Sequence, residues 1–92
     1  MICVDELCSS PINRRWRYKQ SCHLFSDQGV SGDAELRAFA RRIGLLERWI
    51  QNSRGFVHFD LTASMRSQAI REGARPVDRS FIVGCARKAR GR

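Results

Sequence analysis

Residues 56–73 read FVHFDLTASMRSQAIREG and contain, in order, a strand pattern, a helix cap and a helix pattern. The apolar, β-prone run Phe56–Leu61 predicts a strand. Thr62 stands at the expected N-cap, where its hydroxyl can accept a hydrogen bond from the first helical turn. The helix should continue to about Glu72 and stop at Gly73, because glycine readily takes the left-handed conformation that ends helices.

The segments on either side of this stretch alternate between strand and helix patterns. Before it we predict strands at residues 2–7, ending at Asp5 and Glu6, and at residues 21–26. Helices at 34–43, capped by Asp33, and at 45–51 follow, with Gly44 as the break. After it come a short extended piece at 75–77 and a final helix capped by Asp78. The order β-β-α-α-β-α-β-α predicts an α+β or small α/β fold, with a three- to four-stranded sheet and helices on one or both faces.

Ninety-two residues make a single domain over residues 1–92, and the 42% of hydrophobic residues is enough for a small core. The sequence lacks an apolar run of ~18 residues, so no membrane partner is expected. The N-terminal residues carry acids where a signal peptide would carry a basic leader. We therefore expect a cytoplasmic protein.

The chain is strongly basic, with 17 Lys+Arg against 9 Asp+Glu and a formal net charge of +8. Arginine, which dominates the basic residues, binds phosphate through two hydrogen bonds, so the charge predicts a nucleic-acid or nucleotide partner. A basic loop (12–20) interleaves aromatic and cationic residues, and an edge strand with solvated charges would show the same alternation. The predicted phosphate-binding residues of this loop and of the basic tail (87–92) are Arg14, Arg15, Trp16, Arg17, Lys19, Arg87, Lys88 and Arg90.

Four cysteines occur at positions 3, 8, 22 and 85, without any CxxC pair. Cys3, Cys8 and Cys22 together with His23 do not have the spacing of a usual zinc finger or ribbon. We therefore assign no metal ligands and predict free, mostly buried thiols.

Histidines and acids recur on the predicted strands. His58 and Asp60 are two residues apart and should project from the same face of their strand. If the strands are neighbours, Asp5, His23, His58 and Asp60 would converge at one sheet edge, beside a helix start that attracts anions. These four are our candidate catalytic residues, either around a divalent metal such as Mg²⁺ or Mn²⁺ or with a histidine as general base. Thr62, Ser64 and Arg66 are predicted to bind phosphate there. The alternative is a capped helix with structural histidines.

Short ordered motifs resemble a family of small bacterial and phage proteins catalogued as a domain of unknown function. They are VD (4–5), CHL with an acid (22–27), EL-x-x-FA-x-x-IGL (35–45), W-x-Q (49–51), HFDL (58–61), S-x-R (64–66) and GA (73–74). The resemblance implies a prokaryotic or phage intracellular protein whose polar signature is Asp5, His23, Asp27, His58, Asp60, Ser64 and Arg66. This chain has Phe59 and Met65 where the family usually has tyrosine and lysine.

Three functions are compatible with these patterns. The favoured one is a binding protein for a phosphate-bearing partner, such as one that inhibits a host nucleic-acid-guided defence complex in the host cytoplasm. The second is a metal-assisted phosphoesterase or nuclease that uses Asp5, His23, His58 and Asp60; a divalent metal would be its only cofactor. The third is an inhibitor that binds a host protein or ribonucleoprotein complex through protein contacts.

Overall fold

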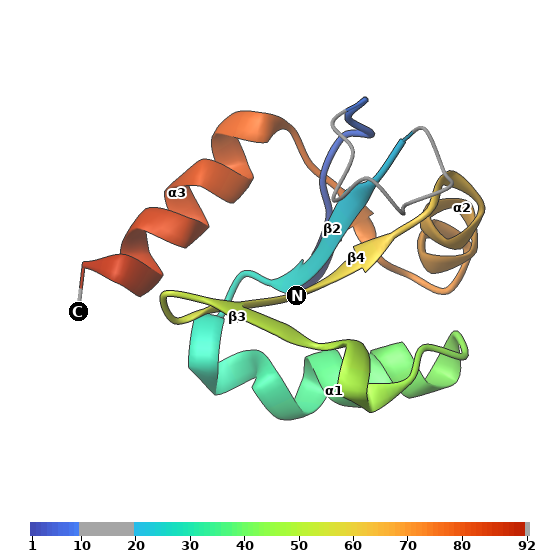
Figure 1. Cartoon of the computed structure of the whole chain (residues 1–92), viewed down its shortest axis with the longest axis horizontal. Coiled ribbons are helices and arrows are strands. Elements are labelled where there is room, and N and C mark those ends of the chain that lie inside the picture. Colours follow the sequence, from blue (N-terminus) through green and yellow to red (C-terminus); the bar gives the residue numbers. More distant parts are fainter. Residues whose placement is uncertain (10–19, 92) are drawn as a thin grey trace.

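A five-stranded mixed sheet organises residues 1–9 and 20–91, which are the residues that this computed structural model describes. The strand order is β3-β4-β2-β1-β5 (Figure 1). β1 lies antiparallel to β2 and parallel to β5, and β4 lies antiparallel to both β2 and β3. The strands are β1 (Ile2–Val4), β2 (Cys22–Ser26), β3 (Gln51–Ser53), β4 (Phe56–Leu61) and β5 (Arg75–Pro76).

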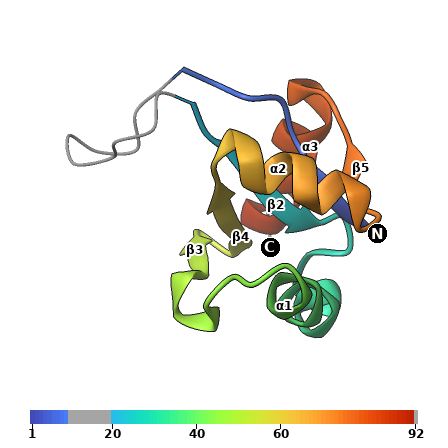
Figure 2. The same ribbon diagram turned by 90° about the vertical axis from the view of Figure 1, so that its right-hand side faces the viewer.

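Three α-helices cover the sheet, α1 (Asp33–Arg42), α2 (Ala63–Arg71) and α3 (Arg79–Arg90). Short 3₁₀ helices precede and follow α1, η1 (Gly29–Gly32) and η2 (Glu47–Trp49). Figure 1 shows α1 and α3 on opposite sides of the sheet, and Figure 2 shows α1 nearly end-on with α2 above it. Of the predicted α+β or small α/β fold with helices on one or both faces, the α+β form is confirmed, and helices lie on both faces.

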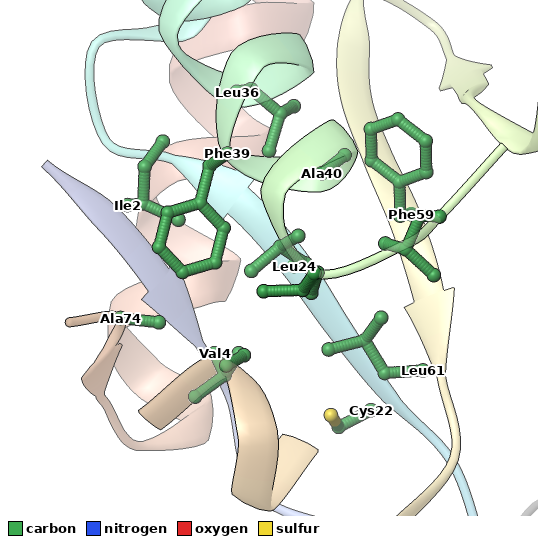
Figure 3. Close-up of a cluster of buried hydrophobic side chains, with 13 residues drawn as sticks. Ile2, Val4, Cys22, Leu24, Leu36, Phe39, Ala40, Phe59, Leu61 and Ala74 are labelled. Atoms are coloured by element: carbon green, nitrogen blue, oxygen red, sulfur yellow. The ribbon is translucent and has the colours of Figure 1, made fainter. Parts of the chain in front are cut away.

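The larger core lies between the sheet and α1 and α2. Alternation along the strands sends Val4, Leu24 and Phe59 to this face, and each is 0% exposed. Leu36 and Phe39 of α1 pack onto them (Figure 3). Burial of this apolar surface is the main stabilising contribution to a fold of this size.

The opposite face is covered only in part. Cys3, Phe25 and Phe56 project there and pack against Ile82 of α3, with Cys85 and two alanines of the same helix at the edge. This second, smaller core occupies one half of the face. The other half carries the polar side chains that follow these residues along β1 and β4 and precede Phe25 along β2.

The predicted helix at 45–51 and the predicted strand count were wrong. Gly44 adopts φ 84°, and Leu45 then becomes buried, so the chain turns after α1 and does not start a second α-helix. Residues 47–49 form only the η2 turn, and β3 follows it as a fifth strand. Apolar residues at helical spacing also fit a turn that packs Leu45 into the core, which is why periodicity misassigned this segment.

Several local predictions were confirmed. The Thr62 hydroxyl accepts a hydrogen bond from the Met65 N–H at 3.2 Å, and the Asp78 carboxylate accepts one from the Phe81 N–H at 2.9 Å. Gly73 has φ 109° just after α2. Asp33, expected to be a cap, instead lies in the first turn of α1, since η1 leads directly into that helix. None of the helices in the described residues combines the length and apolar character needed to cross a bilayer.

Candidate functional site

Asp5, His23, His58 and Asp60 meet on the half of the sheet that α3 leaves uncovered. In the strand register His23 lies directly opposite Asp60. His58 lies opposite Phe25, which is two residues after His23 on β2. Asp5 continues β1 across from His23, whose carbonyl accepts a hydrogen bond from the Asp5 N–H at 3.3 Å. The structure thus brings together all four candidate catalytic residues from three neighbouring strands.

Asp5 holds His23 through both carboxylate oxygens. One oxygen accepts the His23 backbone N–H at 2.6 Å, and the other lies 3.0 Å from the His23 Nδ1. The carboxylate can only accept, so Nδ1 carries the proton in this pair. The Nε2 atom of a neutral His23 is therefore a lone-pair donor, and the His23 side chain is 42% exposed.

His58 is the buried partner, with only 9% of its side chain exposed. Its Nδ1 lies 3.2 Å from the Phe56 carbonyl, which also can only accept, so its Nε2 is unprotonated when the ring is neutral. The ring stacks on Phe56, with centroids 5.3 Å apart, and meets the His23 ring edge-on at 5.1 Å. His58 therefore joins the apolar core under α3 to the polar cluster.

Asp60 stands between the two rings. Its Oδ1 lies 3.9 Å from the His23 Nε2 and 3.8 Å from the His58 Nε2. Its Oδ2 accepts a hydrogen bond from the side-chain amide of Gln51, on the edge strand β3. Gln51 was not among the predicted site residues, although the W-x-Q motif contains it. The reason is that the β3–β4 pairing, which brings Gln51 to Asp60, was not predicted.

The environments of the two histidines shift their pKa values in opposite directions. The hydrogen bond to Asp5 raises the pKa of His23 above 6.5, against the effect of burial. Burial lowers the pKa of His58 below 6.5. At neutral pH His58 is thus the neutral ring, while His23 is the ring that gains a proton more readily. Opposed shifts in neighbouring groups are typical of functional sites.

Arg66 is the cation that the described structure places beside this cluster. Its Nε donates to the Asp5 carbonyl at 2.8 Å from the first turns of α2. The Thr62 hydroxyl is occupied as the helix cap, and Ser64 is exposed in the first turn. A phosphate group near Asp5 would meet this guanidinium and the start of α2.

The other predicted phosphate-binding residues lie elsewhere. The basic tail, with Arg87, Lys88 and Arg90, forms the last turns of α3, where Ala89 lies against Gly55 of the β3–β4 hairpin. Lys88 lines a cavity of about 390 Å³ at that end, next to η1, away from the histidines. The predictions for Arg14, Arg15, Trp16, Arg17 and Lys19 lie outside the described residues. On either side of that segment, Cys8 and Ser21 form an antiparallel bridge, and Ser21 is two residues before His23.

Cys3 and Cys22 lie on opposite faces of the sheet, so they cannot share one metal ion. Cys22 faces the core under α1 and α2, whereas Cys3 faces α3 on the other side of the sheet. No disulfide joins the four cysteines, all of which lie in described positions. Burial raises the pKa of Cys3 to about 11 and that of Cys22 to about 12, so both are thiols at neutral pH.

Fold and site together define an α+β protein with a two-histidine, two-carboxylate cluster on an open half of its sheet. The chain belongs to the family described as "Protein of unknown function (DUF4031)", whose profile matches residues 3–89. This match confirms the resemblance to a domain-of-unknown-function family. Asp27, which the resemblance includes in the polar signature, lies at the far end of β2, where it pairs with the Met1 amino group at 2.8 Å. Comparisons with curated proteins and with solved structures gave no match.

Proposed function

We propose that this protein is a metal-assisted phosphoesterase that acts on a phosphate-bearing substrate, either nucleic acid or nucleotide, in the cytoplasm. The observation that carries the proposal is the approach of both histidine Nε2 atoms to the same Asp60 oxygen, at 3.9 and 3.8 Å. A cluster of imidazoles and carboxylates with opposed pKa shifts is the usual form of a hydrolytic centre.

Each residue of the cluster has a distinct proposed role. His23, His58 and Asp60 would hold the divalent ion, which would supply activation of a water as the nucleophile. Asp5 fixes the ring of His23 through Nδ1. Arg66, anchored on the Asp5 carbonyl, offers its free guanidinium nitrogens to the phosphate. The exposed side chain of His23 would be accessible to the substrate, while the buried His58 stacks on Phe56 beside the apolar residues of α3.

A second candidate is binding of a nucleic acid or nucleotide without turnover, as in an inhibitor of a host nucleic-acid-guided complex. The observation in its favour is unneutralised positive charge. Among the described arginines and lysines, ion pairs with carboxylates within 4.0 Å involve Arg37, Arg41 and Arg42 of α1. The remaining described cations are available to phosphates.

The two candidates are separated by assaying turnover and binding on the same protein. Hydrolysis of bis(p-nitrophenyl) phosphate, fluorescent single-stranded DNA and RNA, and mononucleotides is measured with Mn²⁺, Zn²⁺ or Mg²⁺ and with chelator. Asp60→Asn and His58→Gln test the cluster. Asp27→Asn is the matched control, because it removes a carboxylate at the other end of β2.

Metal-dependent turnover that Asp60→Asn abolishes and Asp27→Asn retains is the expected result. Absence of turnover, together with affinity for DNA or RNA that falls steeply with salt, would replace the phosphoesterase by the binding function. Turnover that survives both cluster substitutions in folded protein would refute the proposed site.

A further inference from the structure

Three possible metal-ligand atoms of the cluster lie close together. The Nε2 atoms of His23 and His58 and a carboxylate oxygen of Asp60 all lie within 4.8 Å of one another. Bonds of about 2.1 Å in tetrahedral geometry put neighbouring ligand atoms roughly 3.4 Å apart. The two nitrogen–oxygen distances of 3.9 and 3.8 Å exceed this value by about half an ångström, and the largest separation in the set, within 4.8 Å, exceeds it by at most about 1.4 Å.

Each ligand is also oriented by a partner on its other side. Asp5 holds the His23 Nδ1, and the Phe56 carbonyl holds the His58 Nδ1, so both Nε2 lone pairs point away from these partners. Metal-binding histidines almost always donate their second ring N–H to a carboxylate or carbonyl in this way. Gln51 binds Asp60 Oδ2 and leaves Oδ1 for the two rings, which favours a carboxylate that binds the ion through one oxygen.

The donor set distinguishes between metals. Mg²⁺ and Ca²⁺ prefer oxygen ligands and an octahedral or larger shell, which two imidazoles and one oxygen do not supply. Imidazole suits Zn²⁺, Co²⁺ and the neighbouring transition metals, and three protein ligands with an open position are typical of catalytic zinc. The side chain of His23 is 42% exposed and that of His58 is 9% exposed, so His23 is the more accessible of the two imidazoles.

We propose that His23, His58 and Asp60 bind one divalent transition-metal ion of the Zn²⁺ or Co²⁺ type in preference to Mg²⁺, and that Gln51 and Asp5 are positioning residues for these ligands. This inference names the metal of the proposed phosphoesterase, and the role of that metal in turnover rests on the proposed function. The metal preference itself is decided by binding alone. The proposed metal therefore differs from the Mg²⁺ or Mn²⁺ that the sequence suggested.

Metal binding is measured on the full chain by calorimetry with Zn²⁺ and Mg²⁺ and by the absorption spectrum of the Co²⁺ form. The expected result is one Zn²⁺ per chain, no saturable Mg²⁺ binding, and a Co²⁺ spectrum of an open nitrogen–oxygen site without thiolate charge transfer. Because the chain has only two histidines, both imidazole ring signals should shift in NMR spectra on Zn²⁺ binding.

Substitutions assign the roles. Asp60→Asn should weaken Zn²⁺ binding more than about 100-fold, and Gln51→Leu about 10- to 100-fold, as expected for an outer partner of a ligand. The matched control is Gln28→Leu, because Gln28 likewise donates to a carboxylate, that of Asp27, at the far end of β2. It should leave Zn²⁺ affinity unchanged. Folding of each variant is verified by circular dichroism.

The outcomes separate the two proposals. Stoichiometric Zn²⁺ binding that requires Asp60, without hydrolysis of any phosphate substrate, would support this inference and remove the phosphoesterase. Hydrolysis that requires Mg²⁺ or Mn²⁺ and Asp60, together with no Zn²⁺ binding, would support the phosphoesterase and remove this inference. Equal affinity for Mg²⁺, thiolate charge transfer in the Co²⁺ form, or Zn²⁺ binding unaffected by Asp60→Asn would each overturn the inference. Equal effects of Gln51→Leu and Gln28→Leu would remove the positioning role of Gln51.

Discussion

The carboxylate of Asp5 binds His23 twice, at the backbone N–H (2.6 Å) and at the ring Nδ1 (3.0 Å). The first bond ties the end of β1 to β2, and the second sets the tautomer of the ring that faces solvent. One carboxylate therefore links the stability of the sheet to the orientation of a site residue. Substitution of Asp5 should therefore change both the free energy of unfolding and the pKa of His23, and the two effects can be measured separately.

Replacing Asp5 should affect both properties. We expect Asp5→Ala to lower the free energy of unfolding by about 1–3 kcal/mol, since the N–H of His23 loses its carboxylate partner. The pKa of His23 should fall, because its hydrogen bond to Asp5 is the largest cause of the raised value. Urea unfolding and NMR titration of the His23 ring measure the two effects.

Asp27→Ala is the control for this substitution. Its partner is the amino group of Met1, whose side chain is 39% exposed, so this surface ion pair should contribute at most about 1 kcal/mol. The His23 pKa should not change in this variant. A fall in the His23 pKa of equal size in both variants would contradict the assigned role of Asp5.

The two histidines should make stability depend on pH in opposite senses in the metal-free protein. The pKa of His23 is raised by folding, so its contribution is fully present below pH 6.5 and is lost as the pH rises through the folded value. The pKa of His58 is lowered by burial, so its contribution is present above pH 6.5 and is lost as the pH falls through the folded value.

Urea unfolding at intervals from about pH 5 to 8 separates these contributions. His58→Gln should reduce the loss of stability on the acidic side, and His23→Gln should reduce the loss on the alkaline side. Two imidazole NMR titrations, one above and one below 6.5, are expected in the wild type. Coincident titrations would refute the difference in environment.

The helix that follows the site should depend on its cap. Thr62→Ala removes the side-chain acceptor for the Met65 N–H and should cost about 1 kcal/mol of unfolding free energy. Ser64→Ala, an exposed position in the same first turn, should change it by less than about 0.5 kcal/mol. Equal losses in the two variants, measured by chemical denaturation, would show that the cap contributes nothing.

The core between the sheet and α1 should tolerate little change. Phe59 is 0% exposed, so Phe59→Ala should cost about 3–5 kcal/mol by removing apolar contacts and leaving a cavity. Val30→Ala, at a residue 76% exposed, should stay within about 0.5 kcal/mol of the wild type. Thermal or urea unfolding compares them, and a loss below about 1 kcal/mol for Phe59→Ala would contradict its burial.

The thiols of Cys3 and Cys22 should be unreactive in the folded protein. Their pKa values of about 11 and 12 leave almost no thiolate, and both side chains are buried. Iodoacetamide at neutral pH should label neither residue until the chain is unfolded in urea, as read by peptide mass spectrometry. Rapid labelling of either residue in the folded state would contradict this expectation.

Much of the local structure could be predicted because its determinants are neighbours in sequence. The strand of Phe56–Leu61, the Thr62 and Asp78 caps and the stop at Gly73 each depend on residues within a few positions. The same-face relation of His58 and Asp60 also follows from the strand period alone. The turn at 44–50 was misassigned, since burial of Leu45 depends on the sheet beneath it.

What the sequence by itself determined, therefore, was most of the elements, apart from those at 45–53, and the identities of the polar residues that end them. The tertiary structure alone decided that Asp5, His23 and Asp60 lie in one row, because their juxtaposition depends on the order β4-β2-β1 and its register. It also decided that Gln51 binds Asp60 and that the basic end of α3 lies away from the histidines. These contacts join residues far apart in the chain, and strand pairing that brings distant segments together is set by the packing of the whole core, which no local pattern encodes.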